Sequence, residues 1–495
     1  MVIGTVTENN ITGDVVMKTY QNLLSVGDED RARMEFIEGA ISDHKQSLAY
    51  MQAKVGDDYS QGHNTTITNY RKLLYTITGK MVPDRYNANH KCASGFFKRN
   101  IIQITSYLLK NGVSFNNPST AKRLGKHFNS DLYKYTKSAL AEGASFGIFN
   151  ADSVKFFKLT EFVPLYDEKT GQLMAGIYFY QLDADRPLRA TLFEPNGYTD
   201  YIKPKNKQMR VLEPRRDYKE IRKTSKADGT YIEGAGNYSV LPIVPLWANT
   251  EHKSELIGQR EQIDAYDLIK SGFANDLDDA SMIYWIVNNA GGMEEADYAK
   301  FLERLRTLHI AGVEGTGDDS VQIESHTTEV PYQSREVYLE RLEKDYYRDA
   351  MMLDTSQIAG GNVTATQIEA AYEALDQRAF ELSNCITDFI DGILKIAGID
   401  DTAILNPDRI INRREETEMV LMASDYLDEE TVLNKLPFLT KAEVEDIMKR
   451  KKEEDASRYN LKSDVEISEG TEGAEGTEGT EGTEEVKIKG ADVID

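Results

Sequence analysis

Two long amphipathic segments flank a short insert in the second half of this chain, and this arrangement strongly limits the possible folds. The first, Ser254 to Ala280, has an apolar stripe at steps of three and four, typical of a helix with one buried face. The second, Gln333 to Met352, is rich in charged pairs at helical spacing. The insert between them, residues 282–331, reads as strands at Met282–Asn288, His309–Val313 and Ser320–Thr327 with a helix at Ala296–Leu308. We therefore predict paired helices that flank a small α/β module.

The regions on either side of these helices differ in character. Residues 1–253 mix helical and strand patterns, and two prolines, Pro242 and Pro245, close this part. Its predicted elements are helices at Asn89–Leu109 and Asp131–Ala141, a hairpin from Ser153 to Leu182, strands at Ala190–Phe193 and Tyr198–Ile202, and an exposed loop or edge strand at Lys203–Lys226. After the break at 353–365, a long helix over 366–398 is expected, with a capping box at Thr366 and Glu369 and an end at Gly398. Shorter helices follow to residue 462, and the acidic Glu-Gly-Thr tail, 463–495, is predicted to be disordered.

Charge is unevenly distributed along the chain. The net charge is −24, which argues against a protein that holds nucleic acid tightly through Lys and Arg. Residues 81–140 carry 10 basic and 2 acidic side chains, whereas residues 251–350 carry 22 acidic and 10 basic. Any DNA contact in the acidic middle must therefore be loose. The chain has no apolar run long enough to span a membrane and no signal peptide pattern, and two cysteines are too few for a disulfide framework.

The motifs that suggest chemistry do not form a catalytic set. Gly143 to Gly147 matches the nucleophile elbow around Ser145, but a helix precedes the serine and extended residues follow it, the reverse of the order that the elbow needs. The glycine-rich run at 312–317 lacks the Lys-Ser/Thr of a phosphate-binding loop. Acidic residues at 276, 278 and 279 are better explained as a solvated helix face than as metal ligands. No cofactor, metal site or enzyme activity is predicted, and a serine hydrolase using Ser145 remains a weak alternative.

Several segments resemble the portal proteins of long-tailed bacteriophages that infect Gram-positive bacteria. The resemblance is most specific in Leu241–Asn249, Ile263–Asp267 and Ser271–Asp278, and it extends over roughly residues 80 to 455. It implies an α+β, predominantly helical fold with wing, stem, clip and crown, assembled into a closed ring of about twelve subunits. Double-stranded DNA would pass through the central channel during packaging and ejection. Another minor head or tail connector protein of the virion is the second alternative.

The resemblance also implies a role for each segment. Residues 1–253 correspond to the wing, 254–281 and 332–352 to two stem helices, and 282–331 to the clip. Residues 353–365 correspond to a tunnel loop, 366–398 to a long wing helix and 399–462 to a helical crown. The implied partners are the terminase large subunit, the head-completion adaptor, and the major capsid and scaffolding proteins, without a membrane. The protein would belong to the portal vertex of the virion and assemble in the cytoplasm of the host bacterium.

Two groups of residues are the candidates for function. In the tunnel loop Asp354 is the only charged residue, two glycines give flexibility, and the polar side chains can form exchangeable hydrogen bonds with a passing duplex. This group comprises Thr355, Gln357, Gly360, Gly361, Asn362 and Thr364. In the clip, Lys300 and Arg304 share one face of the predicted helix, with Arg306 nearby, and we expect them to bind the motor or the adaptor.

Overall fold

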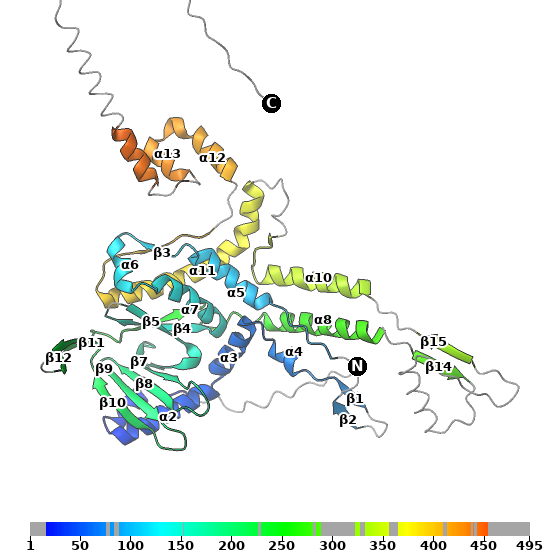
Figure 1. Cartoon of the computed structure of the whole chain (residues 1–495), viewed down its shortest axis with the longest axis horizontal. Helices are drawn as coiled ribbons and strands as arrows, with labels where there is room; N and C mark the ends of the chain where they lie inside the picture. Colours follow the sequence, from blue (N-terminus) through cyan, green and yellow to red (C-terminus); the bar gives the residue numbers. More distant parts are fainter. Residues whose placement is uncertain are drawn as a thin grey trace, which may run out of the picture. The chain divides into compact units, whose positions relative to one another are not determined.

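A computed structural model describes most of the chain, in two compact units, 1–410 and 411–495. The described residues are 16–75, 80–83, 89–151, 153–225, 229–280, 284–288, 322–326, 332–355, 365–408, 413–436, 439 and 443–453. The predicted helix at 296–308, the predicted strand at 309–313 and the acidic tail lie outside them. The fold is mixed α+β, as predicted (Figure 1).

The main core of the first unit lies between a three-stranded sheet and three helices. Strands pair in the order β13-β4-β5, all antiparallel. The elements are β4 (Ala144–Asn150), β5 (Ser153–Lys158), β13 (Ile243–Trp247), α5 (Phe96–Leu109), α7 (Phe128–Glu142) and α11 (Ala365–Ala397). Helix α11 packs so closely on the sheet that a Cβ at Gly147 would lie 2.6 Å from the Phe389 ring. The long helix therefore needs glycine at this position of β4.

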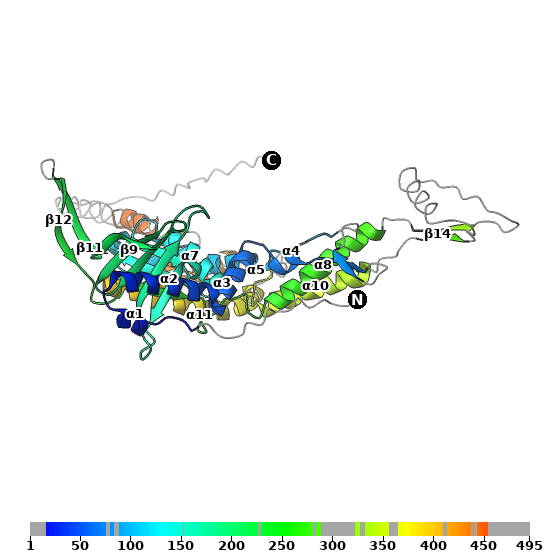
Figure 2. The same ribbon diagram turned by 90° about the horizontal axis from the view of Figure 1, so that it is seen from below.

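A second, five-stranded antiparallel sheet has one face covered by helices α1 and α2. Its strand order is β10-β9-β8-β7-β6, and alternate residues such as Ile177 and Leu192 are buried against these helices. The elements are α1 (Tyr20–Val26), α2 (Asp30–Gln46), β6 (Phe162–Tyr166), β7 (Leu173–Tyr180), β8 (Leu188–Glu194), β9 (Gly197–Lys203) and β10 (Arg210–Arg216). The hairpin prediction for 153–182 is right for β6 and β7, but β5 pairs with β4 instead. The segment predicted as a loop or edge strand, Lys203–Lys226, forms the edge strand β10 and, at Lys219–Ser225, one strand of a projecting ribbon (Figure 2).

The remaining elements of the first unit connect these layers. They are α3 (Leu48–Ser60), α4 (Thr65–Asn69), β1 (Leu73–Tyr75), β2 (Met81–Pro83), β3 (Val113–Phe115), α6 (Pro118–Leu124), η1 (Leu159–Glu161), β11 (Lys219–Ser225), β12 (Gly229–Gly236), α8 (Arg260–Ala280), β14 (Tyr284–Asn288), β15 (Gln322–His326), α10 (Tyr332–Asp349) and β16 (Ala403–Leu405). Strands β14 and β15 pair antiparallel, and β16 pairs with β3.

The second unit contains short helices, as predicted. Helix α12 (Arg413–Met422) and helix α13 (Glu429–Lys435) are separated by η3 (Ser424–Tyr426), and a further helical run covers 443–453. Val444 of that run is buried. Within the described residues of both units, no helix is both long enough and apolar enough to cross a bilayer.

Two predicted helices begin later than the sequence suggested. Helix α5 starts at Phe96, not Asn89. The residues before it are extended, because backbone N–H groups at 90, 92 and 94 donate to side chains of α8. Helix α8 starts at Arg260, not Ser254. The hydroxyl of Ser254 donates to the Ala141 carbonyl at 2.6 Å, and Gly258 has a φ of 86°, which a helix does not allow. Contacts with distant segments and, before α8, the positive φ of Gly258 therefore set the starts of these two helices.

A buried carboxyl group, Glu142 at the end of α7, gives the stability of the first unit a pH dependence. Its side chain is fully buried, accepts a hydrogen bond from the Thr160 N–H at 2.9 Å and lies 3.5 Å from the Lys158 ammonium. Desolvation outweighs these favourable contacts and raises the pKa of Glu142 to about 7. The folded state therefore keeps a proton that the unfolded chain releases near the ordinary Glu pKa.

We expect Glu142→Gln to remove this dependence. As pH rises from about 4.5 to about 7, the wild-type protein should lose up to about 3 kcal/mol of its free energy of unfolding, because the unfolded state binds fewer protons. The variant should match wild type near pH 5 and be the more stable protein near pH 8. Urea unfolding at both pH values measures the difference. A constant difference across this range would show that Glu142 does not titrate as proposed.

Candidate functional site

Helices α8 and α10 lie side by side and run in opposite directions (Figures 1 and 2). At one end of the pair Asp276 forms an ion pair with Arg335, whose guanidinium also lies 5.9 Å from the Phe273 ring centre. At the other end the Gln262 amide donates to Asp349. With 21 and 18 residues, the helices are each about 30 Å long. They form an elongated pair whose far ends lead into β14 and β15.

Aromatic rings join this pair to the main core. The Phe96 ring of α5 stacks on Tyr346 with ring centres 4.9 Å apart and meets Tyr266 edge-on at 4.7 Å. Tyr346 is almost completely buried, and its hydroxyl donates to the Gln259 amide oxygen at 2.9 Å. Such aromatic contacts add to the free energy of burial. The root of the helix pair is therefore fixed to the core through α5.

A polar ladder attaches the extended segment 89–94 to α8. The side chains of Asp267, Ser271 and Asn275 accept hydrogen bonds from three backbone N–H groups of that segment. The pairs are Ser94 with Asp267 at 2.8 Å, Cys92 with Ser271 at 3.0 Å and His90 with Asn275 at 2.7 Å. Four helical residues rise about 6 Å and two extended residues about 6.6 Å, so the two repeats match over this length. The ladder thus follows directly from helix and strand geometry.

The first rung of the ladder is the most deeply buried. Asp267 is completely buried, and burial raises the pKa of its carboxyl even though hydrogen bonds from Asn64 and Ser94 oppose the shift. The Asn64 amide donates to Asp267 at 2.8 Å and to Asp264 at 2.9 Å, and it also caps helix α4. The polar face of α8 is therefore a packing face.

The sequence prediction of a solvated helix face is right for Asp278, which is exposed, and Asp276 is partly exposed. Asp276 is paired with Arg335, and Asp278 contacts the His90 ring. Within the described residues no cluster of His, Cys, Asp and Glu side chains could hold a metal ion. The sequence signal that we missed is the repeat of short polar side chains at steps of four, at 267, 271 and 275.

A second polar network holds the chain where α10 ends and the predicted tunnel loop begins. The Gln103 amide donates to the Leu353 carbonyl at 2.8 Å and accepts from the Leu353 N–H at 3.0 Å. Arg378 of α11 is mostly buried and donates to the Ala350 carbonyl at 3.2 Å and to Glu255 at 3.3 Å. Between these anchors Met351 has a φ of 49°, which is unfavourable for a residue with a side chain. The network therefore maintains a strained turn at the loop's root.

Few of the candidate residues themselves can be placed. Thr355 is exposed, just beyond the Leu353 anchor. Gln357, Gly360, Gly361, Asn362 and Thr364 of the loop and Lys300, Arg304 and Arg306 of the clip lie outside the described residues. The residues that sequence reasoning missed, Gln103 and Arg378, had no local signal because their partners are far away along the chain.

The structure rules out Ser145 as a nucleophile. Ser145 lies in β4 immediately after α7, is completely buried, and its hydroxyl donates to the Tyr135 carbonyl at 2.9 Å. A catalytic serine must instead reach its substrate and be hydrogen-bonded to a base. The hydrolase alternative is therefore wrong.

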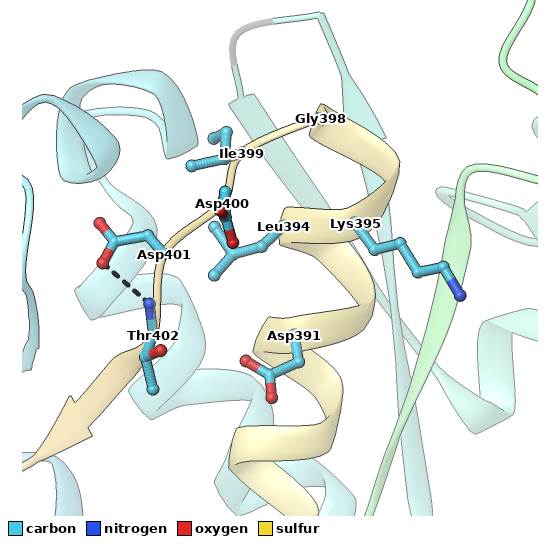
Figure 3. Close-up of a pocket in the computed structure, with 8 residues that line it drawn as sticks. All are labelled: Asp391, Leu394, Lys395, Gly398, Ile399, Asp400, Asp401 and Thr402. Carbon is cyan, nitrogen blue, oxygen red and sulfur yellow. Dashed lines mark hydrogen bonds between the residues drawn. The ribbon is translucent and has the colours of Figure 1, made fainter.

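A pocket at the end of α11 offers no catalytic arrangement either (Figure 3). Asp401 is occupied by hydrogen bonds from the Thr120 hydroxyl at 2.6 Å and from the backbone N–H groups of Asn116 and Asn117, both at 3.1 Å. These bonds, led by that of Thr120, lower the pKa of Asp401. Lys395 extends away from the loop that carries Asp401 (Figure 3). The carboxylate therefore attaches the loop after α11 to helix α6.

Comparison with known proteins gives consistent matches. A family model described as phage portal protein, SPP1 Gp6-like, matches residues 41–457, a longer part of the chain than the resemblance noted in the sequence. A protein of Clostridium phage phiCD119 named portal protein is 28% identical over 168 residues, which is 33% of this chain and 37% of that protein. The portal protein of Bacillus phage SPP1 is 22% identical over 329 residues, 63% of each chain. The chain thus matches less than two thirds of the length of either relative.

Proposed function

Because this chain belongs to the SPP1 Gp6-like family of phage portal proteins, we propose that about twelve copies form a closed ring at one capsid vertex, through which double-stranded DNA is packaged and ejected. The observation that carries the proposal is the family match over residues 41–457. The antiparallel pair α8–α10 supports it, because a ring that crosses a protein shell needs elements about 30 Å long. In this proposal residues 254–281 and 332–352 are the stem.

The other segments take the roles that the family resemblance implies. We propose residues 1–253 and 366–398 as the wing, 282–331 as the clip, 399–462 as the crown and 463–495 as an acidic tail. Residues 353–365 would be the tunnel loop, which contains no Lys or Arg. The Gln103 and Arg378 contacts support this assignment, because they give the loop a fixed starting point at Leu353.

The proposed partners follow from the same assignment. The ring would bind the terminase large subunit during packaging, the head-completion adaptor afterwards, and the major capsid and scaffolding proteins around it. The ATPase would supply the energy for DNA movement, so we propose a structural, non-enzymatic role. The protein would be part of the virion after assembly in the host cytoplasm.

Electron microscopy of the purified protein tests the proposal directly. We expect closed rings with a central hole, because the helix pair leaves apolar side chains such as Leu268 and Leu277 of α8 exposed. Native mass measurement should give one dominant oligomer of about twelve copies. A monodisperse monomer at micromolar concentration would contradict the portal assignment.

For the clip, we expect charge reversal to abolish DNA packaging without preventing ring assembly. Replacing Lys300 and Arg304 by Glu should abolish in vitro DNA packaging while rings still form, because these residues would contact the motor or the adaptor. Packaging assays and electron microscopy of the same preparation measure both properties. Lys253→Glu together with Lys126→Glu, two exposed positions, serves as the control. Normal packaging by the clip variant would mean that its two side chains are only solvent-facing.

A further inference from the structure

A short β-hairpin on the flank of α8 carries apolar side chains that no described part of this chain covers. Strands β1 and β2 form three residue pairs. The exposed fractions of Leu73, Met81 and Val82 are 47%, 59% and 38%. A two-stranded ribbon of this size is at best marginally stable in water by itself. The hairpin is therefore suited to bind another protein surface.

The base of the hairpin is nevertheless firmly held. Before it, α4 is fixed to α8 through Asn64. After it, His90 is the last rung of the polar ladder. The Lys91 ammonium joins the two sides by donating to the carbonyl groups of Thr68 and of Tyr70, the latter at 2.9 Å. A contact element that is already ordered loses little conformational entropy when it binds.

The opposite flank of the helix pair presents a second apolar surface. In Figure 1, α10, α8, α4 and the β1–β2 hairpin follow one another in that order, so α10 and the hairpin lie on opposite flanks. Helix α10 exposes Val337 by 66%, Tyr338 by 49% and, at its first turn, Tyr332 by 55%. Val337 is about 200° around the helix from Arg335, which faces α8, so it marks the outer side of α10. A closed ring requires two different surfaces on opposite flanks of each subunit that fit each other.

Charge also suits a contact between these two surfaces. Residues 70–83 contain three basic side chains, Arg71, Lys72 and Lys80, and no acidic one. The first half of α10, residues 332–340, exposes Glu336 and Glu340, and its one basic residue, Arg335, is paired with Asp276, whereas the exposed Arg341 and Lys344 follow further along the helix. Opposite charges around an apolar centre favour one partner and one orientation.

We propose that the β1–β2 hairpin of one copy docks on the outer face of α10 in the neighbouring copy. This inference rests on the proposed ring and assigns two of its contact surfaces. Leu73 and Met81 share one face of the hairpin by its register, and their burial against Val337 and Tyr338 would supply the apolar part of the contact. The contact would also link neighbouring stems, because both surfaces are attached to the α8–α10 pair.

Paired cysteines test the contact. The variant contains Met81→Cys and Val337→Cys in a background with Cys92→Ser and Cys385→Ser, which removes both natural free thiols. A short bis-maleimide should convert its rings into a ladder of covalent oligomers that reaches the full ring on a denaturing gel. Either cysteine alone should give no ladder. Leu182→Cys, in the exposed turn between β7 and β8, paired with Val337→Cys is the matched control and should also give none.

The outcomes distinguish this inference from the ring itself. If rings form normally but the gel shows no covalent oligomers, or only cross-links within subunits, the proposed hairpin contact is wrong. The proposed function would still stand in that case. Absence of rings in the wild-type protein would overturn both. In a second variant, Leu73→Asp with Met81→Asp should lower the fraction of protein in rings by about tenfold or more, because carboxylates would be buried in the contact. If these rings persist while packaging fails, the hairpin binds another partner and the inference is wrong.

Discussion

Replacing Gln357 and Asn362 by lysine is expected to stall DNA in the channel. In a ring of about twelve subunits the two substitutions add about two dozen positive charges around the proposed constriction. Each phosphate that a lysine neutralises releases counterions, so the ring would hold a duplex that the wild-type loop lets slide. The wild-type segment 353–365 has Asp354 as its only charged residue, which suits weak contacts. We therefore expect packaging to slow greatly or to stop at low salt and to recover partly as salt is raised.

The measurement is the rate of DNA packaging by assembled rings at several salt concentrations. The ATPase rate of the motor and the ring count in electron micrographs should remain normal. Leu182→Lys with Val240→Lys adds the same charge at two exposed sites of the first unit and should leave packaging unchanged. Normal packaging by the loop variant at low salt would mean that residues 353–365 do not line the DNA path.

Apolar periodicity predicted the long helices well. Helix α11 was placed within one residue at each end, and α10 within one residue at its start, because each buries a continuous stripe whose spacing is visible in the sequence. Gly398, with a φ of 63°, marked the end of α11, whereas Thr366 lies inside the helix and is not the N-cap that the capping pattern predicted. Local signals of this kind do not depend on which other segment the helix contacts.

Contacts between distant polar groups were not predictable in the same way. An aspartate that binds another segment's backbone has the same spacing in the sequence as one that faces water, so the sequence did not distinguish the buried Asp267 from the exposed Asp278. Gln103 and Leu353 are 250 residues apart, so no window of sequence contains both. The three-residue strands β3 and β16 pair across a similar separation and were also missed. The root of the loop thus became visible only in the structure.

The polar ladder gives a physical role to the segment of most specific family resemblance. Asp267, Ser271 and Asn275 all lie within the two motifs at 263–267 and 271–278. Their side chains accept hydrogen bonds from three partly buried backbone N–H groups. The motif therefore fixes the segment between the hairpin and α5 to the first helix of the pair.

Asp267→Ala should accordingly be among the most destabilising single changes in this helix. It removes the acceptor of the Ser94 N–H and one of the two acceptors of the Asn64 amide, and each buried N–H left unpaired costs about 1–3 kcal/mol. The substitution also removes the desolvation cost of the buried carboxylate, which is the cause of the raised pKa of Asp267, and this offsets part of the loss. We expect the free energy of unfolding to fall by about 2–4 kcal/mol. Asp267→Asn keeps one acceptor oxygen and should lose roughly half as much.

Hydrogen exchange at the three ladder amides distinguishes a local role from general destabilisation. In Asp267→Ala the Ser94 amide should exchange much faster than in wild type, whereas Cys92 and His90 keep their own acceptors, Ser271 and Asn275, and should change less. Glu261→Ala, at an exposed position of the same helix, should stay within about 0.5 kcal/mol of wild type and leave all three amides unaffected. Equal acceleration of all three amides in Asp267→Ala would instead indicate that segment 89–94 detaches as one unit. Unchanged exchange at Ser94 with unchanged stability would show that the ladder does not hold the segment to α8.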